Sequence, residues 1–223
     1  MKSRYKPNQE LQFFIHDIAS PITNIDLSLQ LIKQSTSEFH QTELETLVNR
    51  AMKSINNINH LIHLNRSYKK ASSIRTFSPL WLVRKLINEN HSNIISQQNI
   101  SISIVGSNNQ MINGNKDAFS KVLDNIISNS IDSFTTYKTI NPKLKFRCTT
   151  LGGKIIITIR DNGPGIKPEN INKIFTKNFS TKHRHIGVGL FISKRIIEKE
   201  FHGMIKVTSK LGSFTEFKIT VPK

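Results

Sequence analysis

The feature that most constrains this chain is a heptad repeat of apolar residues in its first third. Apolar residues recur there at alternating spacings of four and three: Leu11, Ile15, Ile18, Ile22, Ile25, Leu29 and Ile32. After a polar break at residues 34–42, the spacing resumes at Leu44, Val48, Ala51, Ile55, Ile58 and Ile62. A seam of this kind is typical of a helix that packs lengthwise against other helices. The pattern therefore predicts two long helices.

Two such helices with a short connection predict an antiparallel hairpin over residues 1–68. One hairpin alone leaves half of each seam exposed, and pairing with a second copy would bury it in a four-helix bundle. We therefore expect a homodimer. Packing of the hairpin against the rest of the same chain is the alternative, but it does not require two full heptad seams.

The pattern changes after the hairpin, so we expect a multidomain chain. Residues 69–78 (KKASSIRTFS) are typical of a linker, which Pro79 closes. Helices are then expected at Leu80–Gln97, Lys116–Thr135 and Gly189–Glu200. Strands are expected at Ile100–Val105, Leu144–Thr150, Lys154–Arg160, Ile205–Ser209 and Glu216–Val221. Runs of helix and antiparallel strand predict an α+β sandwich over residues 79–223, with one sheet covered by helices.

The composition narrows the setting of the chain. The single Cys148 cannot form an internal disulfide, which fits a reducing compartment. No apolar run approaches the roughly 20 residues that span a bilayer, and the N-terminus is no signal peptide, so we expect a cytoplasmic location. The net charge of +17 suits nucleic acid or an acidic membrane surface. Because lysine is scattered and no base-reading motif is present, we favour scattered surface lysines over a nucleic-acid or membrane role, and a basic surface of this kind also suits an acidic protein partner or a polyphosphate ligand.

His16 is the first candidate for chemistry. It directly follows the seam residue Ile15 and so points toward solvent, with Ser20 one turn on along the same face. Asp17 can orient or deprotonate the imidazole, and a neutral imidazole nitrogen is a competent nucleophile. Pro21 bends the helix at a cost of roughly 3 kcal/mol, which a purely structural helix would avoid. An exposed histidine beside an incidental kink explains these residues alone equally well.

A pair of asparagines is the second candidate. Asn125 and Asn129 in DNIISNSIDS stand at helical spacing on one face. Amide oxygens are neutral hard ligands, suited to Mg²⁺ that a nucleotide's phosphates already partly neutralise. Two solvated asparagines on a polar face are the simpler explanation.

The third candidate is the turn DNGPGI, which follows the strand expected at Lys154–Arg160. Asp161 can accept a hydrogen bond from an amine on a ligand. Gly163 and Gly165 let the backbone turn tightly and approach that ligand closely. An ordinary turn explains the same residues.

The fourth candidate opens the last predicted helix. Gly187 and Gly189 stand at its start, where backbone N–H groups favour phosphate. The basic residues just before it, from Lys182 to His185, add donors. Helix entry alone explains the two glycines equally well.

Taken in order, these stretches resemble the transmitter core of bacterial two-component sensor histidine kinases. FIHDIASPIT is similar to the phosphoacceptor box of that family, DNIISNSID to its N box and DNGPGI to its first glycine box. IFTKNFSTK is similar to the phenylalanine box and lid, IGVGLFISKRIIEKEFHGMIKV to the second glycine box, and GSFTEF to the terminal glycine/threonine segment. The match covers nearly the whole chain in the family's order and spacing.

The resemblance implies a dimerisation and phosphotransfer hairpin followed by an ATP-binding domain of the gyrase/heat-shock-protein/histidine-kinase type, with ATP and Mg²⁺ as ligands. It implies that Asn129 binds Mg²⁺ with support from Asn125, and that Asp161 contacts the adenine amine. The other residues implied to surround the nucleotide are Gly163 and Gly165 beside the base, Gly187, Gly189 and Leu190 by the phosphates, Thr215 near Asp161, and Lys182 in the lid.

The resemblance also implies the activity of a protein histidine kinase. His16 attacks the γ-phosphate of ATP, Asp17 holds the imidazole tautomer and takes up its proton, and the phosphoryl group passes to an Asp of a response regulator. The bend at Pro21 and the linker at 69–78 bring His16 to the nucleotide. The signal comes either from a sensor segment of a longer protein or through a separate partner.

Four positions depart from the family pattern. Ala19 stands where the family has Arg, and Ser20 where Thr or Asn often serves the reverse phosphatase reaction. His185 and Phe214 replace customary glycines in the lid and the last segment. These changes motivate the rival hypothesis of a catalytically weak, kinase-like adaptor that binds a receiver or phosphotransfer protein. Asn125 replaces the basic Glu of ATP-hydrolysing relatives, which favours transfer to a protein residue over activation of water.

Overall fold

The computed structural model describes residues 22–23, 25–32, 46–48, 51, 54–55, 58, 74–177, 179–180, 187 and 189–223. These residues fall into two units, which are treated separately. The helical unit comprises the described residues up to 58, and the α+β unit comprises those from 74 onward. Several sequence predictions lie outside the described residues, namely those for His16, Asp17, Lys182, Ala19, Ser20, His185 and most of the linker.

The helical unit is helical at every described position, as the heptad pattern predicts for both of its segments. Its buried residues are Ser28, Leu47, Ala51 and Ser54. The heptad positions Ile22, Leu29, Val48 and Ile55 are 51%, 54%, 45% and 41% exposed. Much of the described seam is therefore open to solvent in a single chain.

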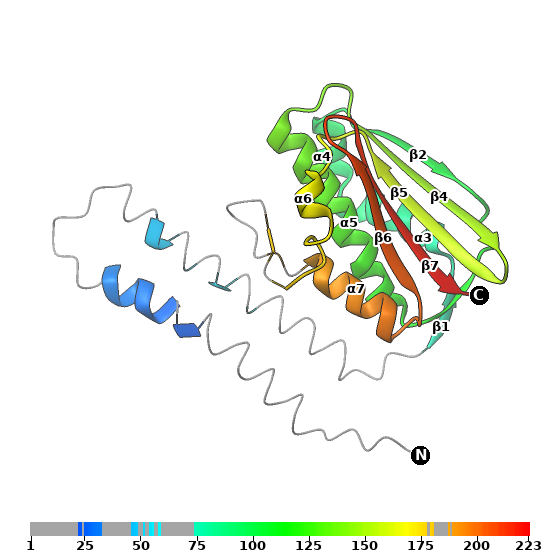
Figure 1. The fold of residues 1–223 in the computed structure, drawn as a ribbon, viewed down its shortest axis with the longest axis horizontal. Helices are drawn as coiled ribbons and strands as arrows, with labels where there is room; N and C mark the ends of the chain where they lie inside the picture. The colour runs from blue at the N-terminus through cyan, green and yellow to red at the C-terminus, as the bar shows by residue number, and fades with distance from the viewer. Residues whose placement is uncertain are drawn as a thin grey trace, which may run out of the picture. The chain divides into compact units, whose positions relative to one another are not determined.

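The α+β unit is built on a five-stranded sheet in the order β2-β4-β5-β7-β6 (Figure 1). Its strands are β2 (Ser101–Val105), β4 (Lys143–Leu151), β5 (Lys154–Asp161), β6 (Met204–Lys210) and β7 (Phe214–Pro222). β2 runs parallel to β4, and the other neighbouring pairs are antiparallel. Buried residues alternate with more exposed ones along β4, β5 and β7, which places them on opposite faces of the sheet.

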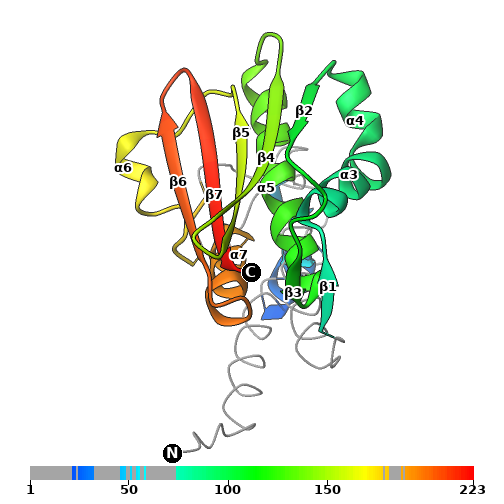
Figure 2. The ribbon, with the colours of Figure 1, turned by 90° about the vertical axis from the view of Figure 1, so that its right-hand side faces the viewer.

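Helices cover one of these two faces. Figure 2 shows α5 (Lys116–Tyr137) and α7 (Gly189–Lys199) behind the sheet, whose other face is open. Asn115 caps α5, since its side-chain oxygen accepts a hydrogen bond of 3.0 Å from the Ala118 N–H. The α+β sandwich predicted from the sequence is thus confirmed. Within the described ranges, no helix combines the length and apolar character that crossing a bilayer requires.

Some predicted elements differ from the observed ones. The single helix expected at 80–97 is two helices, α3 (Pro79–Asn90) and α4 (Ser92–Gln97). The chain leaves helical geometry at His91, whose φ and ψ are −121° and −2°, and the ring of His91 lies 2.8 Å from the Asp124 carboxylate. The parallel pairing of β2 with β4 was also not predicted, because strand periodicity carries no information about direction.

Three short elements were not expected: β1 (Arg75–Phe77), β3 (Ile112–Gly114) and α6 (Pro168–Ile171). β1 lies within the range predicted as linker and pairs antiparallel with β3. Phe77 of β1 packs on Phe119 of α5, with ring centroids 5.4 Å apart, and both rings contact Phe201. The end of the predicted linker is therefore a strand that packs against the helix that carries both candidate asparagines.

Candidate functional site

The site is centred on a carboxylate in the buried face of the sheet. Along β5 the buried positions are Ile155, Ile157, Ile159 and Asp161, so the last core-facing residue of this strand is an acid. Asp161 is 4% exposed and stands opposite Thr215 of β7. Burial of an ionised group is costly unless hydrogen-bond donors surround it.

Asp161 has such donors. The Gly163 N–H donates to its Oδ1 at 2.9 Å, the Ser130 hydroxyl donates to its Oδ2 at 3.0 Å, and Thr215 adds a backbone hydrogen bond. Burial raises the pKa of Asp161, while these hydrogen bonds and the nearby Arg160 charge oppose the rise. Each carboxylate oxygen can accept more than one hydrogen bond. The group can therefore accept a further donor from a ligand.

The glycine turn after β5 leaves no room for side chains. A Cβ on Gly163 would lie 2.9 Å from the Asp161 Oδ1 and 2.9 Å from the Ser133 hydroxyl oxygen. Gly165 has a φ of +69°, and a Cβ there would collide with the backbone of Lys210. Only glycine meets both demands, as the sequence predicted for this turn.

The β6–β7 hairpin holds the same turn in place. The Gly212 N–H donates to the Pro164 carbonyl at 2.7 Å, and the Ile166 N–H donates to the Ser209 hydroxyl oxygen at 2.8 Å. The Ser209 hydroxyl also lies 3.3 Å from that of Thr215. Ser209 therefore connects the glycine turn to the residue opposite Asp161.

The two asparagines have different surroundings. The Asn125 amide donates to the Ser193 hydroxyl of α7 at 3.0 Å, and a Cβ on Gly189 would collide with the Asn125 carboxamide. Asn129, one turn further along α5, makes no side-chain hydrogen bond to any residue that the structure describes, and it is half-buried. The amide oxygen of Asn129 is available to a ligand, and Asn129 immediately precedes Ser130, which binds Asp161.

The start of α7 lies beside this asparagine pair. α7 begins at Gly189, as predicted, and Leu190 packs against the core. Gly187 has a φ of +71°, and a Cβ there would collide with the backbone of Phe179. The first N–H groups of a helix have no partner within the helix and favour anions. This end of α7 can therefore receive phosphate next to Asn125.

The structure thus brings five of the predicted residues of the α+β unit together, in two separate groups. Asp161 contacts Gly163 and Thr215, and Asn125 contacts Gly189. Sequence reasoning missed the hydroxyls that link these groups, namely those of Ser130, Ser193 and Ser209. A signal existed for Ser130, because it interrupts a buried stripe of α5 formed by Ile126, Ile127, Ile131 and Phe134.

These residues fit a nucleotide with a divalent cation. A buried acceptor beside a side-chain-free turn suits the amine edge of a base, and a helix start suits phosphate. Among the described residues there is no cluster of three or more His, Cys, Asp or Glu that could hold a metal ion. A cation at Asn129 would therefore need ligands from phosphate oxygens, as Mg²⁺ often has.

Comparisons with known proteins agree with this class of site. Residues 114–223 match the family described as Histidine kinase-, DNA gyrase B-, and HSP90-like ATPase. A probable C4-dicarboxylate sensor kinase from Halalkalibacterium halodurans is 36% identical over 103 residues, which cover 46% of this chain and 19% of that protein. Sporulation kinase A from Bacillus subtilis is 26% identical over 212 residues, which cover 93% of this chain and 33% of that protein.

A solved structure extends the similarity. The histidine kinase ThkA, crystallised in complex with the response regulator protein TrrA, has a TM-score of 0.63 at 21% identity and covers 96% of this chain and 61% of that chain. The α+β unit is thus an ATPase domain of the histidine kinase type. The chain is thus similar to sensor histidine kinases over nearly its whole length, and its ATPase domain is of a family that includes theirs. It spans well under two thirds of either curated relative.

Proposed function

We propose that this chain is an ATP-dependent protein histidine kinase that phosphorylates itself on His16. The observation that carries the proposal is the buried Asp161, which is held by Ser130 and Gly163 in a domain of the histidine kinase ATPase family. Asp161 accepts a hydrogen bond from the amino group of adenine, and Gly163 and Gly165 leave space for the base.

The phosphates lie toward the start of α7. N–H groups at Gly189 and Leu190 bind phosphate oxygens there, and the family resemblance adds Gly187 and the lid residue Lys182 as further phosphate contacts. Asn129 binds Mg²⁺, which neutralises phosphate charge when it is bound, and Asn125 supports it. Thr215 keeps Asp161 in place through its backbone.

The reaction transfers the γ-phosphoryl group to an imidazole nitrogen. A ring nitrogen of His16 forms the new N–P bond, the bond to the β-phosphate oxygen breaks, and ADP leaves. Asp17 takes up the ring proton. Because Asn125 is an amide and cannot act as a base, the α+β unit has no carboxylate there to activate water. Positioning and charge neutralisation supply most of the rate enhancement, as in phosphoryl transfer generally.

Two partners follow from this proposal. The exposed heptad positions of the helical unit support a homodimer in which a second copy completes a four-helix bundle. ThkA is crystallised with a response regulator, and we extend that kind of partner to this chain, so the phosphoryl group passes from His16 to a receiver Asp.

Incubation with γ-labelled ATP and Mg²⁺ tests the proposal. We expect an acid-labile, base-stable phosphoprotein in the wild type and none in His16→Gln. A His16→Gln protein that still took up label would overturn the assignment of the acceptor. His40→Gln, which alters a histidine outside the predicted phosphoacceptor box, is the matched control and should be labelled like the wild type.

The kinase-like adaptor is the second candidate. Phe214 stands where the family has a glycine. The Arg160 guanidinium lies 3.6 Å from the centre of the Phe214 ring, and this ring fills space that a glycine would leave open. Stabilisation of the protein by Mg²⁺ and a non-hydrolysable ATP analogue, absent in Asp161→Ala, argues for the kinase. Absence of any nucleotide effect in the wild type argues for the adaptor.

A further inference from the structure

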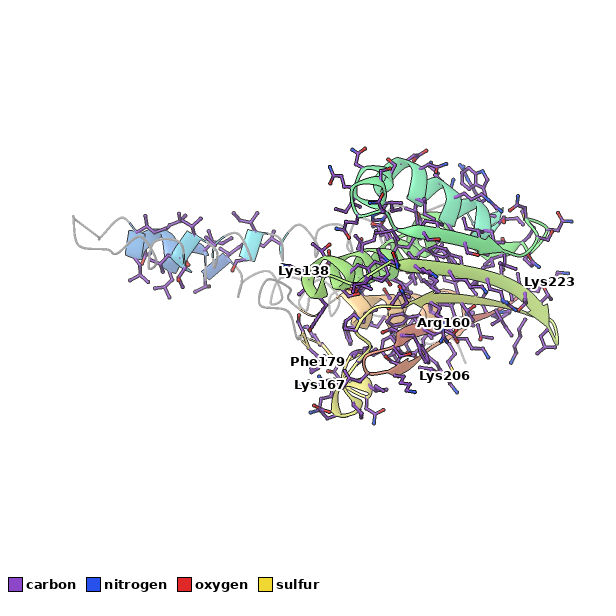
Figure 3. The ribbon with its side chains drawn as sticks, turned by 90° about the horizontal axis from the view of Figure 1, so that it is seen from above. Lys138, Arg160, Lys167, Phe179, Lys206 and Lys223 are labelled. Carbon is purple, nitrogen blue, oxygen red and sulfur yellow. The ribbon has the colours of Figure 1, made fainter. Side chains whose placement is uncertain are left out.

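The face of the sheet turned away from the helices is strongly basic. Register places its outward side chains in rows, and the exposed cations among them are Lys143, Lys145, Arg147, Lys154, Arg160, Lys206, Lys210 and Lys218. Among the residues of these strands that point outward, Glu216 is the single acid, and it lies 3.5 Å from Arg160. Figure 3 labels Arg160 and Lys206 on this side of the sheet. We call this surface the basic face.

The basic face keeps like charges directly opposite each other. Lys145 pairs with Arg160 across β4 and β5, and Lys206 pairs with Lys218 across β6 and β7. Like charges at directly opposed positions of a sheet destabilise it. Glu216 partly offsets the charge of Arg160, but the remaining repulsion works against folding stability, and an anionic partner would relieve it.

One end of the same face carries exposed apolar side chains beside Lys154. Leu151, at the end of β4, is 72% exposed and Met204, at the start of β6, is 47% exposed. Ile156 of β5 lies in the same register row as Met204 and is half-buried. Cationic rows beside an exposed apolar end give the whole face the amphipathic character of surfaces that lie on membranes.

From these features we propose that the basic face binds the surface of an anionic lipid bilayer. The lysines and arginines contact the headgroups, and Leu151 and Met204 enter the boundary between headgroups and acyl chains. Because Asp161 and the glycine turn lie on the opposite face, a chain bound in this way keeps its nucleotide site accessible. The proposal does not depend on catalysis.

Nucleic acid and acidic protein fit this surface less well. Proteins that bind single strands stack bases on exposed aromatic rings, but the one aromatic residue that points outward from these strands, Phe214, is covered by Arg160. A five-stranded face also does not enter a groove of duplex DNA as a helix or two-stranded ribbon does. Neither partner would cover the apolar end formed by Leu151 and Met204.

Vesicle flotation of the full chain tests the proposal. We expect binding to vesicles of phosphatidylcholine with phosphatidylglycerol, none to phosphatidylcholine alone, and a marked decrease on addition of salt. The triple variant K145E/R147E/K218E should lose affinity by about a hundredfold or more, since each cation near an anionic membrane contributes severalfold. Leu151→Ser, which leaves the charge unchanged, should weaken binding severalfold.

The control variant K167E/K173E/K199E makes the same change in net charge at exposed lysines outside the sheet strands. It should bind vesicles within about threefold of the wild type, because it leaves the basic face unchanged. A general effect of net charge would instead weaken the binding of both variants equally. Thermal unfolding checks that both triple variants are folded. Equal losses in the two variants, or equal binding to neutral vesicles, would overturn the proposal. So would binding of a nucleic acid duplex, a single strand or polyglutamate through these residues without vesicle binding.

Discussion

The two faces of the sheet differ in how their charged side chains are surrounded. Arg160 and Asp161 are neighbours in the chain, yet strand alternation sends one to the basic face and the other into the core. The buried carboxylate is held by hydrogen bonds from Ser130, Gly163 and Thr215. Four of the eight exposed cations instead stand opposite one another in two pairs, and Glu216 is the one outward-facing acid in these strands. In our proposals the buried charge of Asp161 binds a small ligand, whereas the exposed charges bind an extended surface.

The largest expected effect is a difference in the free energy of unfolding between substitutions on the two faces of the sheet. Ile157→Ala should lower the free energy of unfolding by about 2–5 kcal/mol, because this fully buried side chain leaves a cavity behind. Thr158→Ala, at the next position on the opposite face, should change it by about 0.5 kcal/mol or less. Urea denaturation of both variants measures the difference, and equal losses would contradict the assignment of the faces.

Much of this sheet could be predicted from the sequence, because alternation is a local property. The strand expected at Lys154–Arg160 is observed at Lys154–Asp161. Three-residue strands such as β1 and β3 are too short for a periodicity to develop, and their pairing depends on residues far apart in the chain. The break of the 80–97 helix at His91 is equally invisible, since no Pro or Gly stands there and His91 contacts Asp124 of α5 only in the folded state.

The site was predictable in its parts but not in its connections. The glycines and asparagines carried their own signals through spacing and turn chemistry. Ser193 and Ser209 carried no such signal, and the place of Ser130 in a buried stripe of α5 did not reveal its partner, because each hydroxyl acquires its role from a residue that only the fold brings close. The hydrogen bond from Ser130 to Asp161 joins positions 31 residues apart.

The second effect concerns nucleotide binding by the buried face. Asp161→Asn should weaken the binding of a Mg²⁺–ATP analogue by about 10- to 100-fold, the value of a hydrogen bond to a charged group. The fold should persist, since the amide can still accept from Gly163 and can donate to Ser130. Calorimetric titration measures the affinity, and Lys218→Gln on the basic face serves as the matched control. Wild-type affinity in Asp161→Asn would remove Asp161 from the site.

A smaller effect is expected from Ser130→Ala, and it depends on pH. Loss of one hydrogen bond should lower the free energy of unfolding by about 1 kcal/mol at neutral pH. Burial raises the pKa of Asp161 in the folded state, so stability that is present below the unfolded value of about 3.9 is lost as pH rises through the folded-state pKa. Ser130 donates to the ionised form, so Ser130→Ala raises this pKa further and increases that loss.

The difference in the free energy of unfolding between the wild type and Ser130→Ala should therefore grow as pH rises above the acid range. Denaturant unfolding at a series of pH values measures it. In an Asp161→Asn background the difference should no longer vary with pH, because the titrating group is gone. A constant difference in the Asp161 protein would contradict the link between the two residues.

The smallest expected effect is on the basic face, and it is a gain rather than a loss in the free energy of unfolding. Lys206→Glu should raise the free energy of unfolding by about 0.2–1 kcal/mol, since it replaces repulsion with attraction toward the directly opposed Lys218. The gain should shrink at high salt, where exposed charges are screened. Lys206→Gln, which removes the repulsion without adding attraction, should lie between the two proteins. The same Lys206→Glu change should weaken binding to anionic vesicles, so stability and binding move in opposite directions. A variant that lost stability and kept its vesicle binding would show that the opposed lysines impose no cost and serve no anionic surface.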